Sequence, residues 1–83
     1  MFVLIVGGGK VGINTARSLR RMGHETMLIE QRTTRYNLLL DELGDEIMMG
    51  DGTEIWVLDK AGIARADLVV AVTGDDEDNV IIA

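Results

Sequence analysis

Continuous apolar stretches alternate along this chain with segments in which apolar and charged residues recur at helical spacing. The stretches around residues 2–6 and 68–72 have almost no polar position, as is typical of parallel strands that are covered on both faces. Because crossovers between parallel strands are right-handed, the alternation predicts an α/β fold with a doubly wound parallel sheet of about four strands in the order 3-2-1-4. The expected strands are residues 2–6, 25–30, 46–49 and 67–72, and the expected helices are about 10–22, 34–43, 53–61 and from 76 onward.

Each of the first three expected helices has an apolar stripe that we expect to pack on the sheet. The stripes are Val11, Ala16, Leu19 and Met22 in the first helix, Tyr36, Leu39, Leu40 and Leu43 in the second, and Ile55, Leu58 and Ala61 in the third. A left-handed cap at Gly23 is expected to end the first helix.

The end of the chain departs from this pattern. A helix from residue 76 would have barely two turns before residue 83, and the strand at 67–72 would have an open edge. We therefore expect either that the chain is a truncated form of a longer domain or that a second copy covers this edge.

Three glycines follow the first apolar stretch and open the first expected helix. Gly7 permits a sharp turn, Gly9 has no Cβ to block an approaching phosphate, and Gly12 lets the helix lie close to the strand. Lys10 and Val11 supply N–H groups at the positive end of the helix dipole. The ammonium group of Lys10 either reaches a phosphate as well or is simply solvated. This loop predicts a Rossmann-like site for the phosphates of a nucleotide.

Glu30 closes the second expected strand and is followed by Gln31 and Arg32. Its carboxylate is suited to accept hydrogen bonds from both hydroxyl groups of a ribose, and it would repel a 2′-phosphate, which disfavours NADP. We include Gln31 and Arg32 in the expected site. Arg32 is either solvent-exposed, the interpretation that we favour, or in contact with additional phosphate.

Two further segments are expected at the same edge of the sheet. Asp51 and Gly52 follow the third strand in a turn whose backbone can approach the adenine, and Thr53 is there too, although we favour it as the N-cap of the third helix. Thr73 and Gly74 end the fourth strand opposite the glycine loop. The acids at 75–78 are interpreted as helix-start residues rather than as ligands of a hard cation, so no metal site is predicted.

The net charge of −6 is unevenly distributed. Six basic residues face two acidic ones up to residue 37, whereas two basic residues face twelve acidic ones after it. The basic half contains the glycine loop, so its field favours an anionic ligand. The acidic net charge, and the fact that the chain has only three aromatic residues, argue against nucleic acid as a partner. With no cysteine and no apolar stretch of membrane-spanning length, we expect a cytoplasmic protein without membrane insertion.

No set of catalytic residues stands out, and we expect no enzyme activity. The single histidine, His24, follows the first helix, at the end of the sheet away from the glycine loop. Tyr36 has no lysine four residues later. One alternative is that the chain is the N-terminal cofactor-binding half of a dehydrogenase or flavoprotein whose catalytic part is missing. Another is a structural Rossmann half that binds no ligand.

Four motifs together resemble the nucleotide-binding domains of Trk-type potassium transport systems, also called regulator of K⁺ conductance N-domains. They are Gly7–Gly12, Glu30, Gly50–Thr53 and Ala71–Asn79. The first two occur in many dinucleotide-binding folds, and the last two are more particular to this family. The resemblance covers residues 1–83, which we interpret as a single, partial Rossmann nucleotide-binding domain.

The resemblance implies a cytoplasmic regulatory subunit that binds NAD(H) or ATP/ADP and gates a membrane-embedded K⁺ transporter or channel. Such a subunit would lie at the inner face of the membrane and form a dimer or a higher homo-oligomer. The residue roles that the resemblance implies are Gly9, Val11 and Thr73 near the phosphates, Glu30 at the adenosine ribose, and Asp51 and Thr53 by the adenine.

Overall fold

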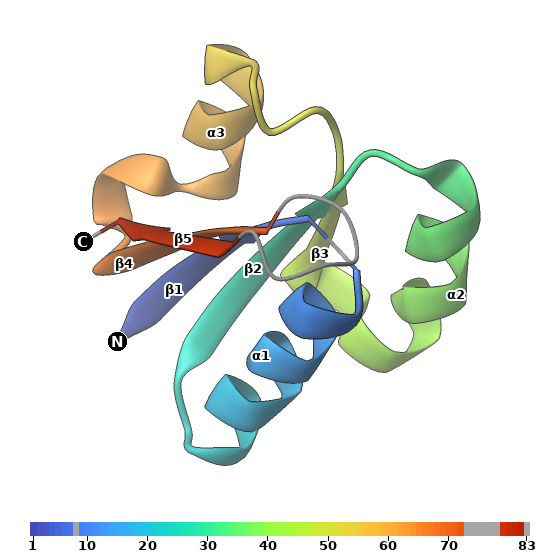
Figure 1. Ribbon diagram of the computed structural model, residues 1–83, viewed down its shortest axis with the longest axis horizontal. Coiled ribbons are helices and arrows are strands. Elements are labelled where there is room, and N and C mark those ends of the chain that lie inside the picture. The colour runs from blue at the N-terminus through green and yellow to red at the C-terminus, as the bar shows by residue number, and fades with distance from the viewer. Residues whose placement is uncertain (8, 73–78, 83) are drawn as a thin grey trace.

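The structure, a computed structural model, describes residues 1–7, 9–72 and 79–82 of the chain (Figure 1). Its strands are β1 (Phe2–Val6), β2 (Glu25–Glu30), β3 (Ile47–Met49), β4 (Leu68–Val72) and β5 (Asn79–Ile82). The helices are α1 (Lys10–Arg21), α2 (Thr33–Leu43) and α3 (Ile55–Ala61), and two short 3₁₀ helices are η1 (Gly44–Glu46) and η2 (Ile63–Arg65).

The five strands form one sheet in the order β3-β2-β1-β4-β5. β1, β2, β3 and β4 are parallel, which confirms the predicted order 3-2-1-4. In this register Val6 pairs with Ile29 of β2 and with Ala71 of β4, so the carboxyl ends of the three strands lie level with one another. Parallel strands of this kind place the connections that follow them at one edge of the sheet.

The predicted helix from residue 76 is wrong over residues 79–82, which form β5. This strand pairs with β4 in antiparallel orientation, with Ile81 opposite Val70. The edge of β4 that we expected to be open is therefore covered by the chain itself. A run of β-branched residues fits a strand, and pairing satisfies the backbone groups that an edge strand leaves exposed. The expected start of the helix and the acids at 75–78 lie outside the described residues.

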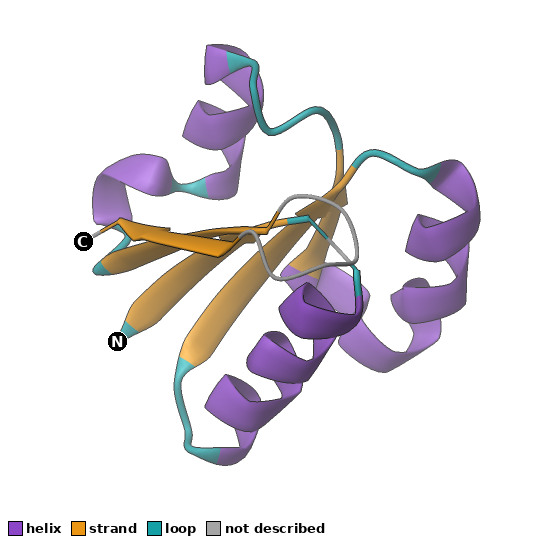
Figure 2. Ribbon diagram, in the orientation of Figure 1, coloured by secondary structure: helices purple, strands orange, loops and turns teal. Residues whose placement is uncertain are grey.

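Helices cover the sheet on both faces, with α1 and α2 on one face and α3 on the other (Figure 2). Each face has its own apolar cluster, because successive residues of a strand point to opposite faces. The buried members are Val3, Ile5, Ala16, Leu28, Leu39, Leu43, Ile47 and Val70 on the side of α1 and α2, and Leu4, Ile29, Val57 and Ala61 on the side of α3.

Three residues of the predicted apolar stripes are exposed instead: Met22, Leu40 and Ile55. Met22 lies beyond the end of α1, where Gly23 adopts the left-handed conformation that we predicted for the cap. α2 packs through Leu39 and Leu43 rather than Leu40. Ile55 is the first residue of α3, and Val57 takes the buried position that we had assigned to it.

Candidate functional site

The turn between β1 and α1 depends on glycine at two positions. Gly7 has a φ of 106°, which residues with a side chain rarely adopt, and its N–H donates to the carbonyl oxygen of Ile29 at 2.8 Å. A Cβ on Gly12 would overlap the carbonyl oxygen of Gly7. The loop and the first turn of α1 can therefore lie this close only when position 12 has no side chain.

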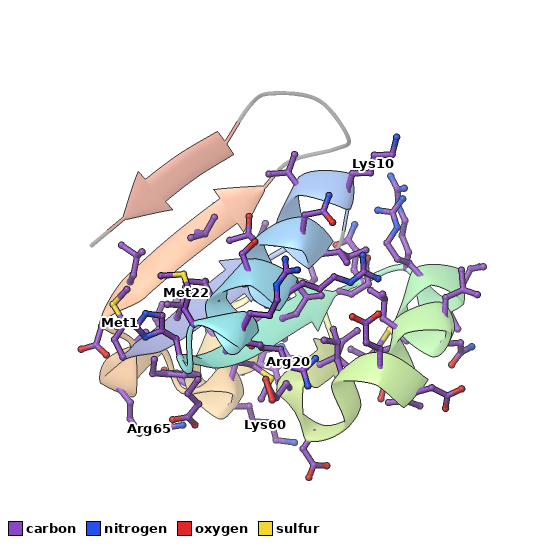
Figure 3. The ribbon with its side chains drawn as sticks, turned by 90° about the horizontal axis from the view of Figure 1, so that it is seen from below. Met1, Lys10, Arg20, Met22, Lys60 and Arg65 are labelled. Atoms are coloured by element: carbon purple, nitrogen blue, oxygen red, sulfur yellow. The ribbon has the colours of Figure 1, made fainter. Side chains whose placement is uncertain are left out.

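Helix α1 begins directly after this turn and directs its N-terminus at the carboxyl edge of the sheet. Its N-cap is Gly9, whose carbonyl oxygen accepts the N–H of Ile13 at 2.9 Å. The N–H groups of Lys10, Val11 and Gly12 come before the first intrahelical bond, as at any helix N-terminus, and they form a positive dipole end. The Lys10 side chain is exposed and extends outward from the start of the helix (Figure 3).

Glu30, the last residue of β2, is buried, with an exposed fraction of 3%. Its Oε2 accepts the backbone N–H of Arg32 at 2.7 Å, and its Oε1 lies 3.9 Å from Nη1 of Arg35. A buried carboxylate is costly unless such partners compensate it. The N-terminal end of α2 supplies both partners, because Arg32 is the N-cap of that helix and Arg35 lies in its first turn.

The turn between β3 and α3 lies against Glu30 and β1. The N–H of Gly50 donates to the carbonyl oxygen of Glu30 at 3.0 Å, and a Cβ on Gly52 would overlap the Val6 side chain. Oδ1 of Asp51 accepts both the N–H and the hydroxyl group of Thr53, at 2.9 and 2.8 Å. The backbone N–H first and the hydroxyl second hold the pKa of Asp51 below its ordinary value.

The predicted role of Thr53 as N-cap of the third helix is wrong. α3 begins at Ile55 with Glu54 at the N-cap position, two residues later than we predicted. The Thr53 hydroxyl group donates to Asp51 instead, in a local turn of the kind that competes with helix capping.

These three segments surround a cavity of about 530 Å³ at the carboxyl edge of the sheet. Its volume lies within the range of roughly 300–1,000 Å³ that small-molecule sites occupy. One side is apolar and is formed on the α3 face of the sheet by Val6, Ile29, Leu58, Ile63, Val69 and Ala71. We call this set the apolar wall. Polar groups, with Glu30 among them, lie on the other side, so the cavity combines an apolar surface with a few placed charges.

Most of the predicted site residues line this cavity. They are Gly7, Gly9, Glu30, Gln31, Arg32, Asp51, Gly52 and Thr53. Lys10, Val11 and Gly12 are not among its lining residues, although they start the helix beside it. Thr73 and Gly74 lie outside the described residues. The Arg32 side chain is exposed, as we favoured.

Sequence reasoning missed Arg35 and the apolar wall as parts of the site. In the sequence, Arg35 is simply one of the six basic residues up to residue 37. It could have been found from its position in the first turn of the helix that follows Glu30. That turn lies at the edge of the sheet where β2 ends.

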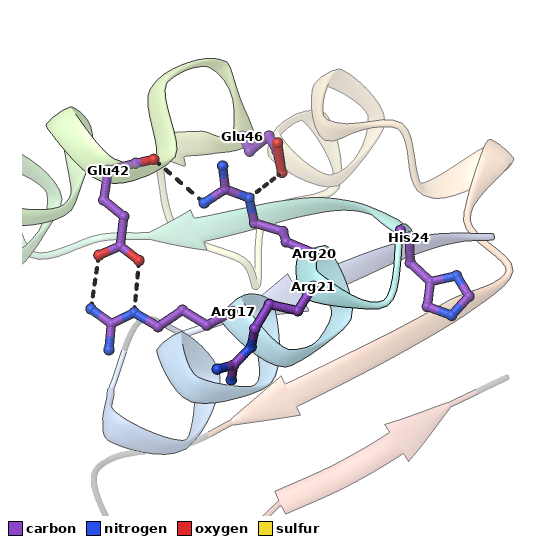
Figure 4. A pocket seen from close by; sticks show the side chains of 7 residues that line it. Arg17, Arg20, Arg21, His24, Glu42 and Glu46 are labelled. Atoms are coloured by element: carbon purple, nitrogen blue, oxygen red, sulfur yellow. Dashed lines mark hydrogen bonds and ion pairs between the residues drawn. The ribbon is translucent and has the colours of Figure 1, made fainter.

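A second cavity, of about 600 Å³, lies at the amino end of the sheet, between α1 and α2 (Figure 4). Arg17 forms a two-bond ion pair with Glu42, with N···O distances of 2.7 and 2.8 Å, and Arg20 pairs with Glu46 at 3.2 Å. The hydrogen bond between the first two raises the pKa of Arg17 and lowers the pKa of Glu42. His24 also lines this cavity, at the end of the sheet where we expected it.

Among the residues described, there is no helix with the length and apolar character needed to cross a bilayer.

Comparison with known proteins agrees with this architecture. The sequence model of the TrkA-N domain family matches residues 3–83. A Trk system potassium uptake protein TrkA homolog of Methanothermobacter thermautotrophicus is 42% identical over 81 residues, which are 98% of this chain and 38% of that protein. A protein of the same description from Pyrococcus abyssi is 33% identical over 98% of this chain and 36% of its own length. The Trk system potassium uptake protein TrkA of Azorhizobium caulinodans is also 33% identical, over 98% of this chain and 18% of its own length.

The chain thus spans less than two fifths of the length of each of these relatives. The family match covers nearly all of its residues, including both glycine turns and Glu30. The chain belongs to the TrkA-N domain family.

Proposed function

We propose that this domain binds an adenine nucleotide, NAD(H) or ATP/ADP, in the cavity at the carboxyl edge of its sheet. The observation that carries the proposal is the buried acid Glu30, which lines that cavity between a glycine turn and the start of a helix. Burying a charged group costs stability, so its retention at a cavity points to a binding role.

The residues around the cavity fit the parts of such a ligand. The first turn of α1, beside the backbone of Gly7 and Gly9, would hold phosphates, because the N–H groups that precede the first intrahelical bond and a positive dipole end attract anions. The Glu30 carboxylate would accept hydrogen bonds from the ribose hydroxyl groups. The apolar wall and the turn at Asp51 would hold the adenine ring.

We further propose that the domain is a cytoplasmic regulatory part of a K⁺ uptake system and acts on a membrane-embedded transporter or channel subunit. The support is family membership and the names of the relatives, which are potassium uptake proteins. In this proposal a homo-oligomer of the domain has two arrangements, and nucleotide shifts their populations because it binds one of them more tightly. The nucleotide is bound and released unchanged. His24, the single histidine, lies at the opposite end of the sheet from the cavity.

Isothermal titration calorimetry with NADH, NAD⁺, ATP, ADP and NADP⁺ tests the binding proposal. Glu30→Ala should weaken binding of the preferred nucleotide by about 1.5–3 kcal/mol, which is the range for hydrogen bonds to a charged group. Glu42→Ala is the matched control, because it removes the same side chain at the other end of the sheet. If none of the five nucleotides bound to the wild-type chain, the binding proposal would be refuted.

The regulatory proposal needs a cellular measurement. In the organism of origin, chromosomal Glu30→Ala should change the K⁺ uptake rate while the protein level stays constant, and Glu42→Ala should leave uptake unchanged. If Glu30→Ala had lost nucleotide binding but K⁺ uptake was as fast as in the wild type, the proposal that this domain controls transport would be refuted.

A further inference from the structure

Helix α3 has one side that packs on the sheet and another that no described residue covers. Val57 and Ala61 are buried on the inner side, and Leu58 lines the cavity. On the outer side Ile55 is 76% exposed and Trp56, the single tryptophan of the chain, is 57% exposed. Tryptophan is well buried in most folded proteins and is enriched among the residues that carry the energy of protein interfaces. The outer side of α3 is therefore a candidate interaction surface.

The indole ring of Trp56 is held by a neighbouring carboxylate. Its Nε1 donates to Oε2 of Glu54 at 2.7 Å, so the polar atom of the ring has a partner and the rest of the ring is apolar. Asp59 is exposed too and lies one turn along, three residues after Trp56 and four after Ile55. An aromatic ring beside two carboxylates suits a cation, because ring face and acids both attract positive charge.

The charge around this surface discriminates between possible partners. Asp51, Glu54 and Asp59 are acidic, whereas Lys60 is the one basic residue between positions 51 and 61. An exposed tryptophan alone would suit a membrane surface, but the excess of acids opposes contact with anionic lipid headgroups. A second copy of the chain that met this surface with its own would bring the same acids. The surface is complementary to a protein segment in which arginine or lysine lies next to apolar side chains.

We propose that the outer side of α3 docks a basic and apolar segment of a partner protein. The docking face consists of Glu54, Ile55, Trp56 and Asp59. An arginine or lysine of the partner lies over the indole ring and pairs with the acids, and an apolar side chain packs on Ile55. The inference rests on the proposed regulatory function, which requires a membrane-embedded partner. Cytoplasmic segments of membrane proteins carry an excess of lysine and arginine, which is the chemistry that this face fits.

Leu38 provides a matched control for Ile55. It is an aliphatic residue of α2 with the same exposed fraction, 76%, and α2 lies on the opposite face of the sheet from α3 (Figure 2). Ile55→Lys and Leu38→Lys therefore make the same change in charge at equally exposed positions. Circular dichroism and calorimetry with nucleotide confirm that both variants are folded and keep their nucleotide affinity.

The first measurement uses the fluorescence of Trp56, because the chain has no other tryptophan. The probes are two synthetic amphipathic peptides of equal length, one of leucine and arginine and one of leucine and glutamate. The arginine peptide should shift the emission to shorter wavelength and bind at least about tenfold more tightly than the glutamate peptide. Ile55→Lys and Glu54→Gln/Asp59→Asn should each weaken its binding at least about tenfold, and Leu38→Lys by less than about threefold.

The second measurement identifies the partner in the organism of origin. The photoreactive residue p-benzoylphenylalanine replaces Ile55 or Leu38, and cross-linked peptides are sequenced by mass spectrometry. Position 55 should cross-link to an arginine- or lysine-containing segment of a membrane subunit for K⁺ transport, and position 38 should not. Cross-links from position 55 only to lipid or to a second copy of the chain would overturn the proposed partner.

Failure of this inference and failure of the proposed function are distinguishable. If neither Glu30→Ala nor Ile55→Lys changed K⁺ uptake, the regulatory function itself would fail. If Glu30→Ala changed uptake, but Ile55→Lys bound the arginine peptide as tightly as the wild-type chain and left uptake unchanged, the function would stand and the docking face would be excluded.

Discussion

The two ends of the sheet each have a cavity, and their charged residues have different roles. At the amino end, Arg17 and Glu42 pair across the gap between α1 and α2 with side chains that are 45% and 39% exposed. At the carboxyl end, Glu30 is 3% exposed and lines a smaller cavity with an apolar wall. Exposed ion pairs contribute little to stability, whereas a buried charge must be compensated by specific partners.

Cavity volume alone therefore does not single out the proposed nucleotide site. The larger cavity, of about 600 Å³, is a gap between two helices in which arginines and glutamates already neutralise one another. The smaller one is bounded by turns in which a Cβ on Gly12 or on Gly52 would overlap a neighbouring atom. Natural sequences depart from the most stable choice mainly at functional sites, and the carboxyl end has both a buried acid and these turns.

The largest effect should come from Gly12→Ala. The added Cβ would overlap the carbonyl oxygen of Gly7, which is backbone and cannot rotate away, so α1 or the turn must shift. We expect a loss of about 1–3 kcal/mol in the free energy of unfolding, as for other overpacked sites, together with weaker nucleotide binding. Urea unfolding and calorimetry measure the two effects.

Gly23→Ala is the control for Gly12→Ala. It makes the same substitution at the other end of α1. Gly23 has a positive φ, and a Cβ there would meet no atom within 4 Å. It should lower stability through backbone strain and leave nucleotide affinity unchanged. Equal nucleotide affinity in Gly12→Ala and the wild-type chain would contradict the view that this close approach shapes the site.

Gly52→Ala should have a smaller effect, and one that can be rescued. Its Cβ would overlap Cγ1 of Val6, a half-buried side chain that can move, so we expect a loss of about 1 kcal/mol. Val6→Ala removes the obstructing methyl groups. The double variant should be at least about 0.5 kcal/mol more stable than the sum of the single effects, measured as a double-mutant cycle in urea. Strict additivity would show that the turn and β1 are not in contact.

The sheet order and the position of Glu30 could be predicted from sequence because they depend on local patterns. Apolar runs identified β1, β2 and β4, and the residue that closes a parallel strand must lie at the carboxyl edge of the sheet. The glycine turn was predictable for the same reason, since the positive φ of Gly7 is a local requirement.

The parts that could not be predicted depend on competition between alternatives of similar free energy. The short apolar run at 80–82 fits a helix or a strand equally well, and pairing with β4 decides between them. From the sequence, the Thr53 hydroxyl group could cap a helix N-terminus or donate to Asp51. In the structure it donates to Asp51. Arg35 lies in the first turn of the helix that follows Glu30, so its place at this edge could be inferred from sequence, whereas its approach to the Glu30 carboxylate depends on the direction in which α2 leaves the sheet.

Lowering the pH should reveal the contribution of Asp51 to the stability of the fold. Because its pKa is lowered in the folded chain, its hydrogen bonds to Thr53 stabilise the fold fully above the pKa of an unfolded aspartate, about 3.9. This contribution is lost as the pH falls through the lower folded value. Asp51→Asn should therefore flatten the decline of stability below about pH 5, measured by urea unfolding at a series of pH values. An identical pH profile for both chains would exclude the contribution.

The smallest effect is expected at the amino end, and it completes the comparison between the two cavities. Arg17→Met and Glu42→Gln each break an exposed ion pair, so the urea midpoint should change little, and added salt should reduce even that difference. Because the pKa of Glu42 is lowered, its contribution to stability is lost as the pH falls through that value. The free energies of unfolding of the wild-type chain and Glu42→Gln should therefore converge in acid.

Nucleotide affinity should be the same in both variants and in the wild-type chain, whereas Glu30→Gln, the same substitution at the carboxyl end, should lower it. A clear loss of nucleotide affinity in Arg17→Met would assign a binding role to the charged cavity and overturn the contrast between the two ends of the sheet.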